Sequence, residues 1–236
     1  MPRTARVAPG AQVYHVLTRG NNRQNVFEDK KDFRRYLELL LRYKEKYRFK
    51  LYHYVLMTNH VHLVIEPSDG EGSLSEIMKG INLAYAQYYK RKYSHTGHFW
   101  QDRYKSIIIS KDEYLLACGS YVELNPVRAK MVEDPNDYVW SSYGAYAYGK
   151  GDVLVDEHPV YLQLSEDDGE RKRRYREFVR GMLKEKDAMK GEMDRRIVYG
   201  SERFVQEITT AYNISEKIKQ MGRQRGWRKN KENRPL

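Results

Sequence analysis

The spacing of apolar and polar residues predicts regular structure through most of the first 150 residues. Four short runs combine apolar, β-branched and aromatic residues over lengths typical of strands. They lie at residues 11–18, 49–57, 61–66 and 104–109. A polar turn at Thr58-Asn59 separates the second run from the third, and Pro67 ends the third.

Three further segments repeat their apolar residues every three or four positions, which predicts helices. The first begins at Asp29 and continues to about residue 47. The second and third each open on a capping box, in which a serine and a glutamate three residues later satisfy each other's backbone N–H groups. These boxes are Ser73–Glu76 and Ser110–Glu113.

The order strand, helix, strand, strand, helix, strand, helix predicts an α+β fold, a ferredoxin-like antiparallel sheet with its helices on one face. This unit is expected over residues 1–150, and Gly149–Gly151 marks its end. Residues 151–236 are expected to form a basic, mainly helical extension. Within it, 201–221 predicts a helix-turn-helix or a solvated basic helical tail, and 222–236 a disordered basic arm.

The charge of the chain indicates anionic partners. The 236 residues include 43 Lys or Arg and 32 Asp or Glu, a formal net charge of +11, and the pI is about 9.5. Phosphate backbones, anionic lipids and acidic proteins all fit such a balance. The 21 tyrosines, interleaved with Arg and Lys, favour binding of unstacked single-stranded nucleic acid over a duplex groove. The alternative is that many of them are core residues whose hydroxyl groups reach solvent.

Cysteine content and hydropathy restrict the cellular compartment in which the protein is expected. The single cysteine, Cys118, excludes an intramolecular disulfide and a zinc cluster built on cysteines, and it fits a reducing compartment. No run approaches the roughly 18 apolar residues that cross a bilayer, and the N-terminal segment lacks the apolar region of a secretory signal. We therefore expect a cytoplasmic protein that does not contact a membrane.

Two histidines at alternate positions of one predicted strand form the first candidate site. In the stretch NHVHL (59–63), the side chains of His60 and His62 project to the same side of the strand. Two imidazoles so placed can hold one divalent cation, such as Zn, Mn, Fe or Ni. A pair of surface histidines on a half-exposed strand is the alternative.

A tyrosine and an asparagine four residues apart form the second candidate site. Tyr121 and Asn125 would share one face of a continuous helix. A free phenol has a pKa near 10, but a nearby cation favours the phenolate and polarises phosphate oxygens, so Tyr121 could then attack a phosphodiester. Alternatively, Tyr121 is a core residue, and Asn125 caps a new helix that Pro126 begins.

These residues together resemble those of the single-tyrosine HUH transposases, and among them the REP-associated tyrosine transposases. The likeness lies in His60-Val61-His62, in Tyr121 with the stretch YVELNPVRAKMV, in LTRGNNRQNVF (17–27) and in GHFWQDRYKS (97–106). It covers roughly residues 8–148. The resemblance makes His60 and His62 metal ligands, Tyr121 the nucleophile, and Asn125 a third, polar metal ligand.

The resemblance also implies an activity. It is that of a metal-dependent single-stranded DNA endonuclease and strand transferase, a transposase acting at hairpin-forming palindromic repeats. Mg or Mn would hold the scissile phosphate while Tyr121 attacks it, leaving a 5′-phosphotyrosine link and a free 3′-hydroxyl that can reverse the step. The partner is single-stranded DNA with hairpins, which places the protein at the nucleoid. Monomer and homodimer both stay open.

Further residues of the matched segments are expected to contact DNA. They are Arg19, Asn21, Asn22, Arg23, Phe99, Trp100, Arg103, Tyr104, Lys105 and Arg128. The alternatives are that Phe99 and Trp100 are buried anchors and that Arg128 pairs with a carboxylate. His15 and His53 are expected on strands, without a catalytic part. A non-catalytic, domesticated protein that binds hairpin DNA or RNA is the alternative function, although the histidine pair and the tyrosine are intact.

Overall fold

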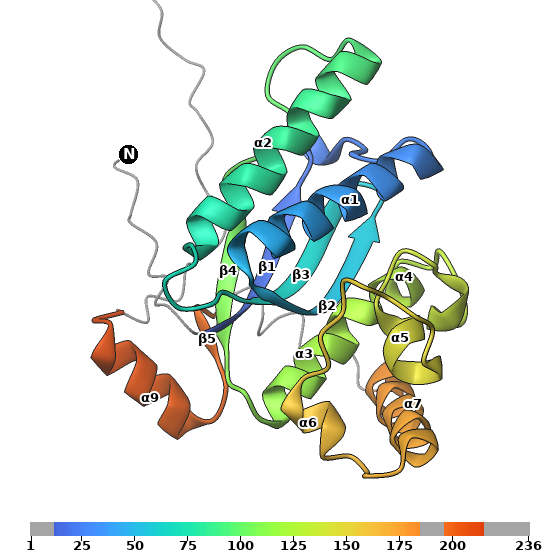
Figure 1. Ribbon diagram of the computed structural model, residues 1–236, viewed down its shortest axis with the longest axis vertical. Coiled ribbons are helices and arrows are strands. Elements are labelled where there is room, and N and C mark those ends of the chain that lie inside the picture. The colour runs from blue at the N-terminus through green and yellow to red at the C-terminus, as the bar shows by residue number, and fades with distance from the viewer. Residues whose placement is uncertain (1–11, 185–195, 215–236) are drawn as a thin grey trace, which may run out of the picture.

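The computed structural model describes residues 12–184 and 196–214, which are built around a five-stranded sheet (Figure 1). The strand order is β2-β3-β1-β4-β5. Neighbouring strands are antiparallel except β4 and β5, which are parallel, so the sheet is mixed. The strands are β1 Val13–Arg19, β2 Lys50–Met57, β3 His60–Glu66, β4 Lys105–Ile109 and β5 Val198–Tyr199.

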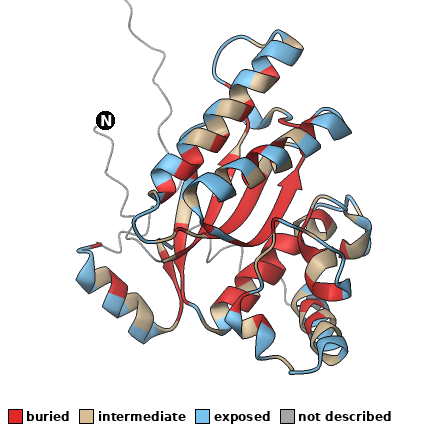
Figure 2. Ribbon diagram, viewed as in Figure 1, coloured by how far each residue is buried: buried red, intermediate tan, exposed pale blue. Residues whose placement is uncertain are grey.

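Two long helices, α1 (Lys30–Tyr47) and α2 (Leu74–Tyr93), cover one face of the sheet (Figure 1). Successive strand residues point to opposite faces, so Tyr14 and Val16 of β1 pack in the cluster beneath these helices, whereas Val13 packs on the other side. Figure 2 shows buried residues along the central strands and on the inner sides of the helices.

The opposite face is covered by α3 (Glu113–Glu123), which packs on β2, β3 and β4. Cys118 and Val122 of this helix lie in one buried cluster with strand residues such as Val55 and Val64. The predicted α+β class is confirmed, but the sheet is mixed and not antiparallel throughout. The helices also occupy both faces. The reason is the composition of β2 and β3, which are buried along almost their whole length and therefore need cover on both sides.

The helix starts follow the capping rules, with one correction. Ser73 and Glu76 form the predicted capping box of α2. The predicted box at Ser110–Glu113 is wrong, because Asp112 caps α3 by accepting from the Tyr114 N–H at 3.1 Å, and Ser110 instead donates its hydroxyl to Asp112. A further capping box, Asp29 with Asp32, begins α1.

After α3 the chain forms short helices and one longer helix that surround the outer side of α3 (Figure 1). Buried tyrosines dominate their contacts: Tyr143, Tyr146, Tyr161 and Tyr175 pack with Leu116 and Leu124. The elements are α4 Asn125–Arg128, α5 Tyr143–Tyr148, α6 Pro159–Leu162 and α7 Asp168–Lys184, with the 3-10 helix η2 Pro135–Asp137. Another 3-10 helix, η1 Asn21–Arg23, lies between β1 and α1.

Residues beyond 150 contact the sheet unit at several points. The Tyr54 hydroxyl donates to Asp152 at 2.7 Å, and Lys44 forms an ion pair with Asp156 at 2.7 Å. In the predicted helix-turn-helix, the first helix is α9 (Glu202–Ala211), and the second lies outside the described residues. The predicted basic arm, 222–236, also lies outside them.

Candidate active site

The histidine pair and the tyrosine lie on the same side of the sheet. Strand alternation turns His60 and His62 of β3 toward the face that α3 covers, and α3 turns Tyr121 toward β3. The ring centroids of His60 and His62 are 5.0 Å apart, and those of His62 and Tyr121 are 6.1 Å apart. Three rings from two distant parts of the chain, β3 and α3, thus form one cluster.

A third histidine, His15 of β1, joins this cluster. Its Nε2 lies 2.7 Å from Nδ1 of His62, the two rings are within 3° of parallel, and its ring centroid is 6.0 Å from that of Tyr121. The strand register explains the contact, because His15 is paired with Val64, the next residue of β3 on the same face as His62. His15 therefore lies on a strand, as expected, and it borders the candidate site through His62.

Burial keeps these two imidazoles neutral. His15 and His62 are each only 4% exposed. Burial lowers the pKa of His15 to about 4, and burial together with the neighbouring His15 and His60 holds the pKa of His62 well below its usual range. Neutral imidazole is the form that binds a metal ion.

The hydrogen-bond partners favour the Nε2 atoms of both candidate ligands as metal-binding atoms. Nδ1 of His60 lies 2.5 Å from the amide oxygen of Asn59, which can only accept, so the neutral ring carries its lone pair on Nε2. If Nδ1 of His62 donates to His15, Nε2 of His62 likewise carries a lone pair. Such outer hydrogen bonds fix the tautomer and the ring orientation of histidine ligands.

Tyr121 occupies the last turns of α3, where it is 7% exposed. The guanidinium carbon of Arg128 lies 5.2 Å from its ring centroid, and Nη1 of Arg128 donates to the Tyr121 carbonyl at 3.2 Å. A guanidinium over a phenol ring favours negative charge on that phenol. Arg128 therefore lies beside the proposed nucleophile.

Asn125 ends the tyrosine helix through its side chain. Its Nδ2 donates to the carbonyls of Tyr121 and Val122 at 2.9 and 3.1 Å. Val122 needs this donor because the helical partner of its carbonyl would be the N–H of Pro126, which proline lacks. The alternative expectation, that Asn125 caps a new helix begun by Pro126, is wrong: Asn125 is the first residue of that helix, and its side chain caps the end of α3.

A buried carboxylate two residues after Tyr121 holds α3 in place. Glu123 is fully buried, and it lies 2.9 Å from Nδ1 of His53 and accepts from the hydroxyls of Ser142 and Tyr175 at 2.6 Å each. These partners belong to β2, to the start of α5 and to α7. Because a buried carboxylate needs such partners, this network fixes the end of the helix that carries Tyr121.

The close approach of α3 to β2 depends on a glycine. A Cβ at Gly119 would lie 2.3 Å from Nε2 of His53, a distance that no side chain tolerates. Sequence reasoning missed Glu123 and His53 as positioning residues, since neither the buried environment nor their pairing can be read from spacing. The one usable signal was a glutamate at the end of an otherwise apolar helix face.

Several predicted DNA contacts meet at the end of the sheet where β3 begins. The Gly20 N–H donates to Asn59, the Asn21 N–H donates to Phe99, and the Gln101 N–H donates to Arg19. These bonds bring η1 and residues 99–101 next to the turn that precedes His60. In η1, the side chains of Asn22 and Arg23 are exposed. In the segment that follows residues 99–101, those of Arg103 and Lys105 are exposed.

The aromatic residues of this region have a different environment. Phe99 is 3% exposed and packs against Tyr85, Tyr89 and Trp100, so it cannot offer its ring to a base, and the alternative of a buried anchor describes it. Tyr104 is also buried, with its hydroxyl 3.0 Å from that of Ser75. Trp100 is half-buried and donates its indole N–H to Asn82.

The described residues contain no cluster of three His, Cys, Asp or Glu side chains suited to a metal ion. The predicted metal ligands are two imidazoles and one amide, so they would not form a cluster of three such side chains. None of the helices in ranges 12–184 and 196–214 is long and apolar enough to cross a membrane.

Comparisons with known proteins agree with the fold. A family model described as "Transposase IS200 like" matches residues 11–125. A solved REP-associated tyrosine transposase bound to a REP hairpin is 16% identical, with a TM-score of 0.54, and the match covers 66% of this chain and 92% of that one. A putative transposase from Deinococcus radiodurans is also 16% identical, with a TM-score of 0.36, over 55% and 92% of the two chains. No curated protein matches the chain.

The family match extends from just before β1 to Asn125, and so includes His60, His62 and Tyr121. The likeness to the hairpin-bound transposase shows that the fold is shared. The resemblance seen in the sequence is thereby confirmed, and residues 11–125 are similar to the IS200-like transposases.

Proposed function

We propose that the protein is a transposase that cleaves and rejoins single-stranded DNA at hairpin-forming repeats, with Tyr121 as the nucleophile. The observation that carries this proposal is the placement of Tyr121 beside His62, on the same face of the sheet and 6.1 Å between ring centroids. The hairpin in the structure of the related transposase supports the substrate class.

The residues at the site fit a divalent metal ion. His60 and His62 would bind it through Nε2, since their Nδ1 atoms are engaged with Asn59 and His15. The amide oxygen of Asn125 would be the third ligand, because its nitrogen is held by backbone carbonyls. Bound Mg or Mn would supply Lewis-acid polarisation of the scissile phosphate.

The chain's own groups perform the transfer step. The Tyr121 phenol gives its proton to solvent, and the phenolate oxygen attacks phosphorus. The bond from phosphorus to the 3′-oxygen breaks, and that oxygen takes a proton from solvent to leave as a 3′-hydroxyl. The phosphoester is conserved as a 5′-phosphotyrosine, so the reverse attack rejoins strands without an external energy source. Arg128 over the Tyr121 ring would favour the phenolate.

A trapping experiment tests the proposal. The protein is incubated with hairpin-bearing single-stranded DNA and Mg or Mn, then denatured and run on a gel. We expect a covalent adduct only with DNA labelled at its 3′ end, because the downstream fragment stays on the protein. Tyr121→Phe should abolish the adduct completely.

Tyr114→Phe is the matched control, since Tyr114 lies on the same helix but contacts Tyr199 at the far edge of the sheet. It should form the adduct as the wild type does. An adduct that persists in Tyr121→Phe would reject the nucleophile. Hairpin binding without any adduct in the wild type would favour the non-catalytic, domesticated alternative.

A further inference from the structure

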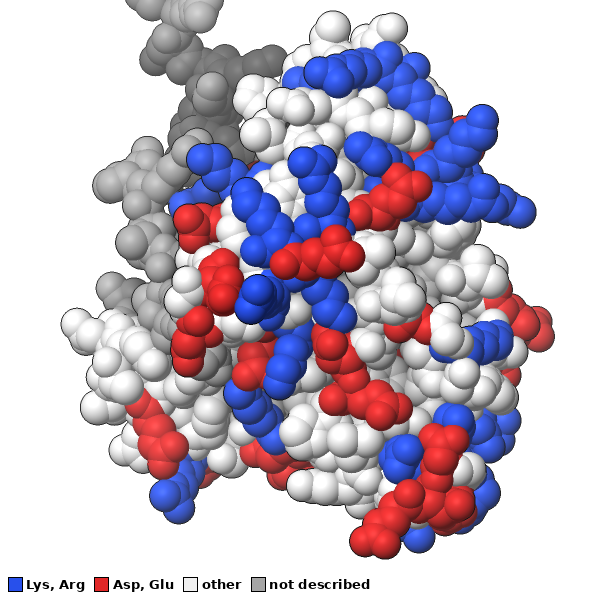
Figure 3. Space-filling model, in the orientation of Figure 1, with Lys and Arg blue, Asp and Glu red and all other residues white. Residues whose placement is uncertain are grey.

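The positive charge of the described residues is concentrated on the two helices opposite the active site. Together, α1 and α2 contain eleven Lys or Arg and four Asp or Glu. All other described residues contain nineteen Lys or Arg and twenty-two Asp or Glu. Figure 3 views this helical face, on which the Lys and Arg side chains gather. The candidate active site lies on the other side of the sheet and contributes nothing to this surface.

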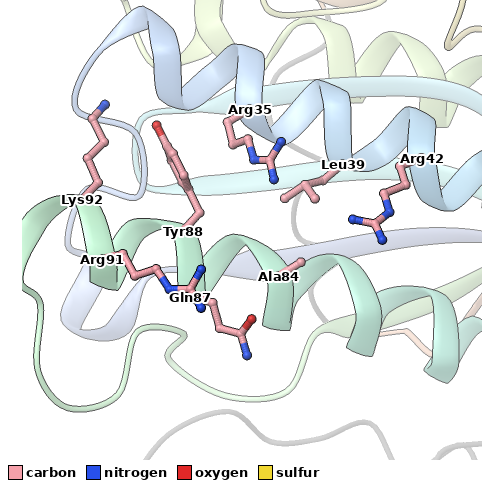
Figure 4. Close-up of a pocket in the computed structure, with 8 residues that line it drawn as sticks. All are labelled: Arg35, Leu39, Arg42, Ala84, Gln87, Tyr88, Arg91 and Lys92. Carbon is pink, nitrogen blue, oxygen red and sulfur yellow. The ribbon is translucent and has the colours of Figure 1, made fainter.

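A groove between the two helices collects four of these cations. It encloses about 460 Å³ and is lined by Arg35, Leu39, Arg42, Ala84, Gln87, Tyr88, Arg91 and Lys92. Figure 4 shows Arg35 and Arg42 reaching from α1 toward α2. They are seven positions apart, which is about 10.5 Å along the helix, a length over which one DNA strand carries about three phosphates.

Internal pairing engages only part of this charge. Lys92 forms ion pairs with Asp29 and Asp32, and Arg35 pairs with Glu38. Arg42 and Arg91 are exposed on facing helices, and their side chains make no ion pair in the described structure. The groove therefore presents two outward guanidinium groups to an anionic partner.

We propose that this groove binds the phosphate backbone of double-stranded DNA, independently of sequence and of the chemistry at Tyr121. The cations are those that phosphate contacts require. A single strand would need an open aromatic face for its bases. The one aromatic side chain here, Tyr88, lies between Arg35 and Lys92, whose charged groups are 5.9 and 5.7 Å from its ring centroid, and its hydroxyl is bound to Asp32.

The test uses a blunt, hairpin-free duplex of 20 base pairs with a fluorescent label, titrated with the full chain from 50 to 200 mM NaCl. The double variant Arg42→Gln/Arg91→Gln removes two phosphate contacts. We expect about tenfold weaker binding at 50 mM NaCl, and a plot of log affinity against log salt that is shallower by about two. Circular dichroism of both proteins verifies that the variant is folded.

Arg173→Gln/Arg180→Gln on α7 is the matched control, because it removes the same charge from the other side of the sheet. It should bind the duplex as the wild type does, and Tyr121→Phe should do so as well. A double variant in the groove that keeps both affinity and salt slope would overturn the proposal, and so would an equal loss in the α7 control. Loss of binding to phosphatidylglycerol vesicles with unchanged duplex binding would assign the groove to lipid instead.

Discussion

At the scale of single residues, the site depends on hydrogen bonds that orient groups before any metal or DNA arrives. His15 sets the orientation of His62, Asn59 that of His60, and Arg128 lies over Tyr121. Strand alternation was enough to predict that His60 and His62 share a face. The part played by His15 was not predictable, because strand register, which places it beside His62, leaves no trace in the spacing of residues along one strand.

We expect His15→Phe to weaken Mn binding by about ten- to a hundredfold, because it removes the hydrogen-bond partner of a metal ligand while keeping the volume filled. Electron paramagnetic resonance of free Mn during a titration measures this without relying on DNA cleavage. His98→Ala, at an exposed loop position, is the control and should bind Mn as the wild type does. Equal Mn affinity in His15→Phe and the wild type would show that His15 is only packed against the site.

At the scale of elements, the position of α3 decides whether Tyr121 faces the histidines. The helix order and the cap of α2 followed from apolar spacing and capping residues. The cover of the second face by α3 did not, although the unbroken burial of β2 and β3 was its signal. The anchoring of α3 by Glu123 and by the close contact at Gly119 depends on partners from β2, α5 and α7, which only the folded chain brings together.

Two glycine substitutions distinguish the close contact of Gly119 with His53 from the general effect of replacing a helical glycine by alanine. Gly119→Ala places a Cβ against His53, so we expect the free energy of unfolding to fall by about 1–3 kcal/mol and the adduct yield to drop. Gly181→Ala on α7 meets nothing within 4 Å and should raise the free energy of unfolding by roughly 0.5–1 kcal/mol. Urea denaturation measures both changes. Similar effects of the two substitutions would contradict the close packing of α3 on β2.

At the scale of the whole molecule, the candidate active site and the basic groove between α1 and α2 lie on opposite sides of one sheet. The net charge of +11 predicted an anionic partner but not a location, because the charged positions of α1 and α2 are distant from each other in sequence. The fold places the histidines and Tyr121 on one face and the basic groove on the other.

The buried histidines make the stability of the whole chain depend on pH. Burial lowers the pKa of His15 to about 4 and holds that of His158 well below its usual range, so the unfolded chain binds more protons than the folded chain between about pH 4 and 6.5. Stability should therefore fall as the pH drops below about 6.5, by about 2 kcal/mol from His15 alone at pH 5, and stay level from pH 7 to 8. Urea denaturation in EDTA checks this, and a flat profile from pH 7 to 5 would contradict it.

The most direct measurement of the central claim is mass spectrometry of the trapped protein–DNA adduct after nuclease and protease digestion. We expect a nucleotide attached through its 5′-phosphate to the Tyr121 phenol, on the peptide that also contains Glu123. A nucleotide on any other residue, or attached through a 3′-phosphate, would contradict the assignment of Tyr121 as the nucleophile beside the metal-binding histidines.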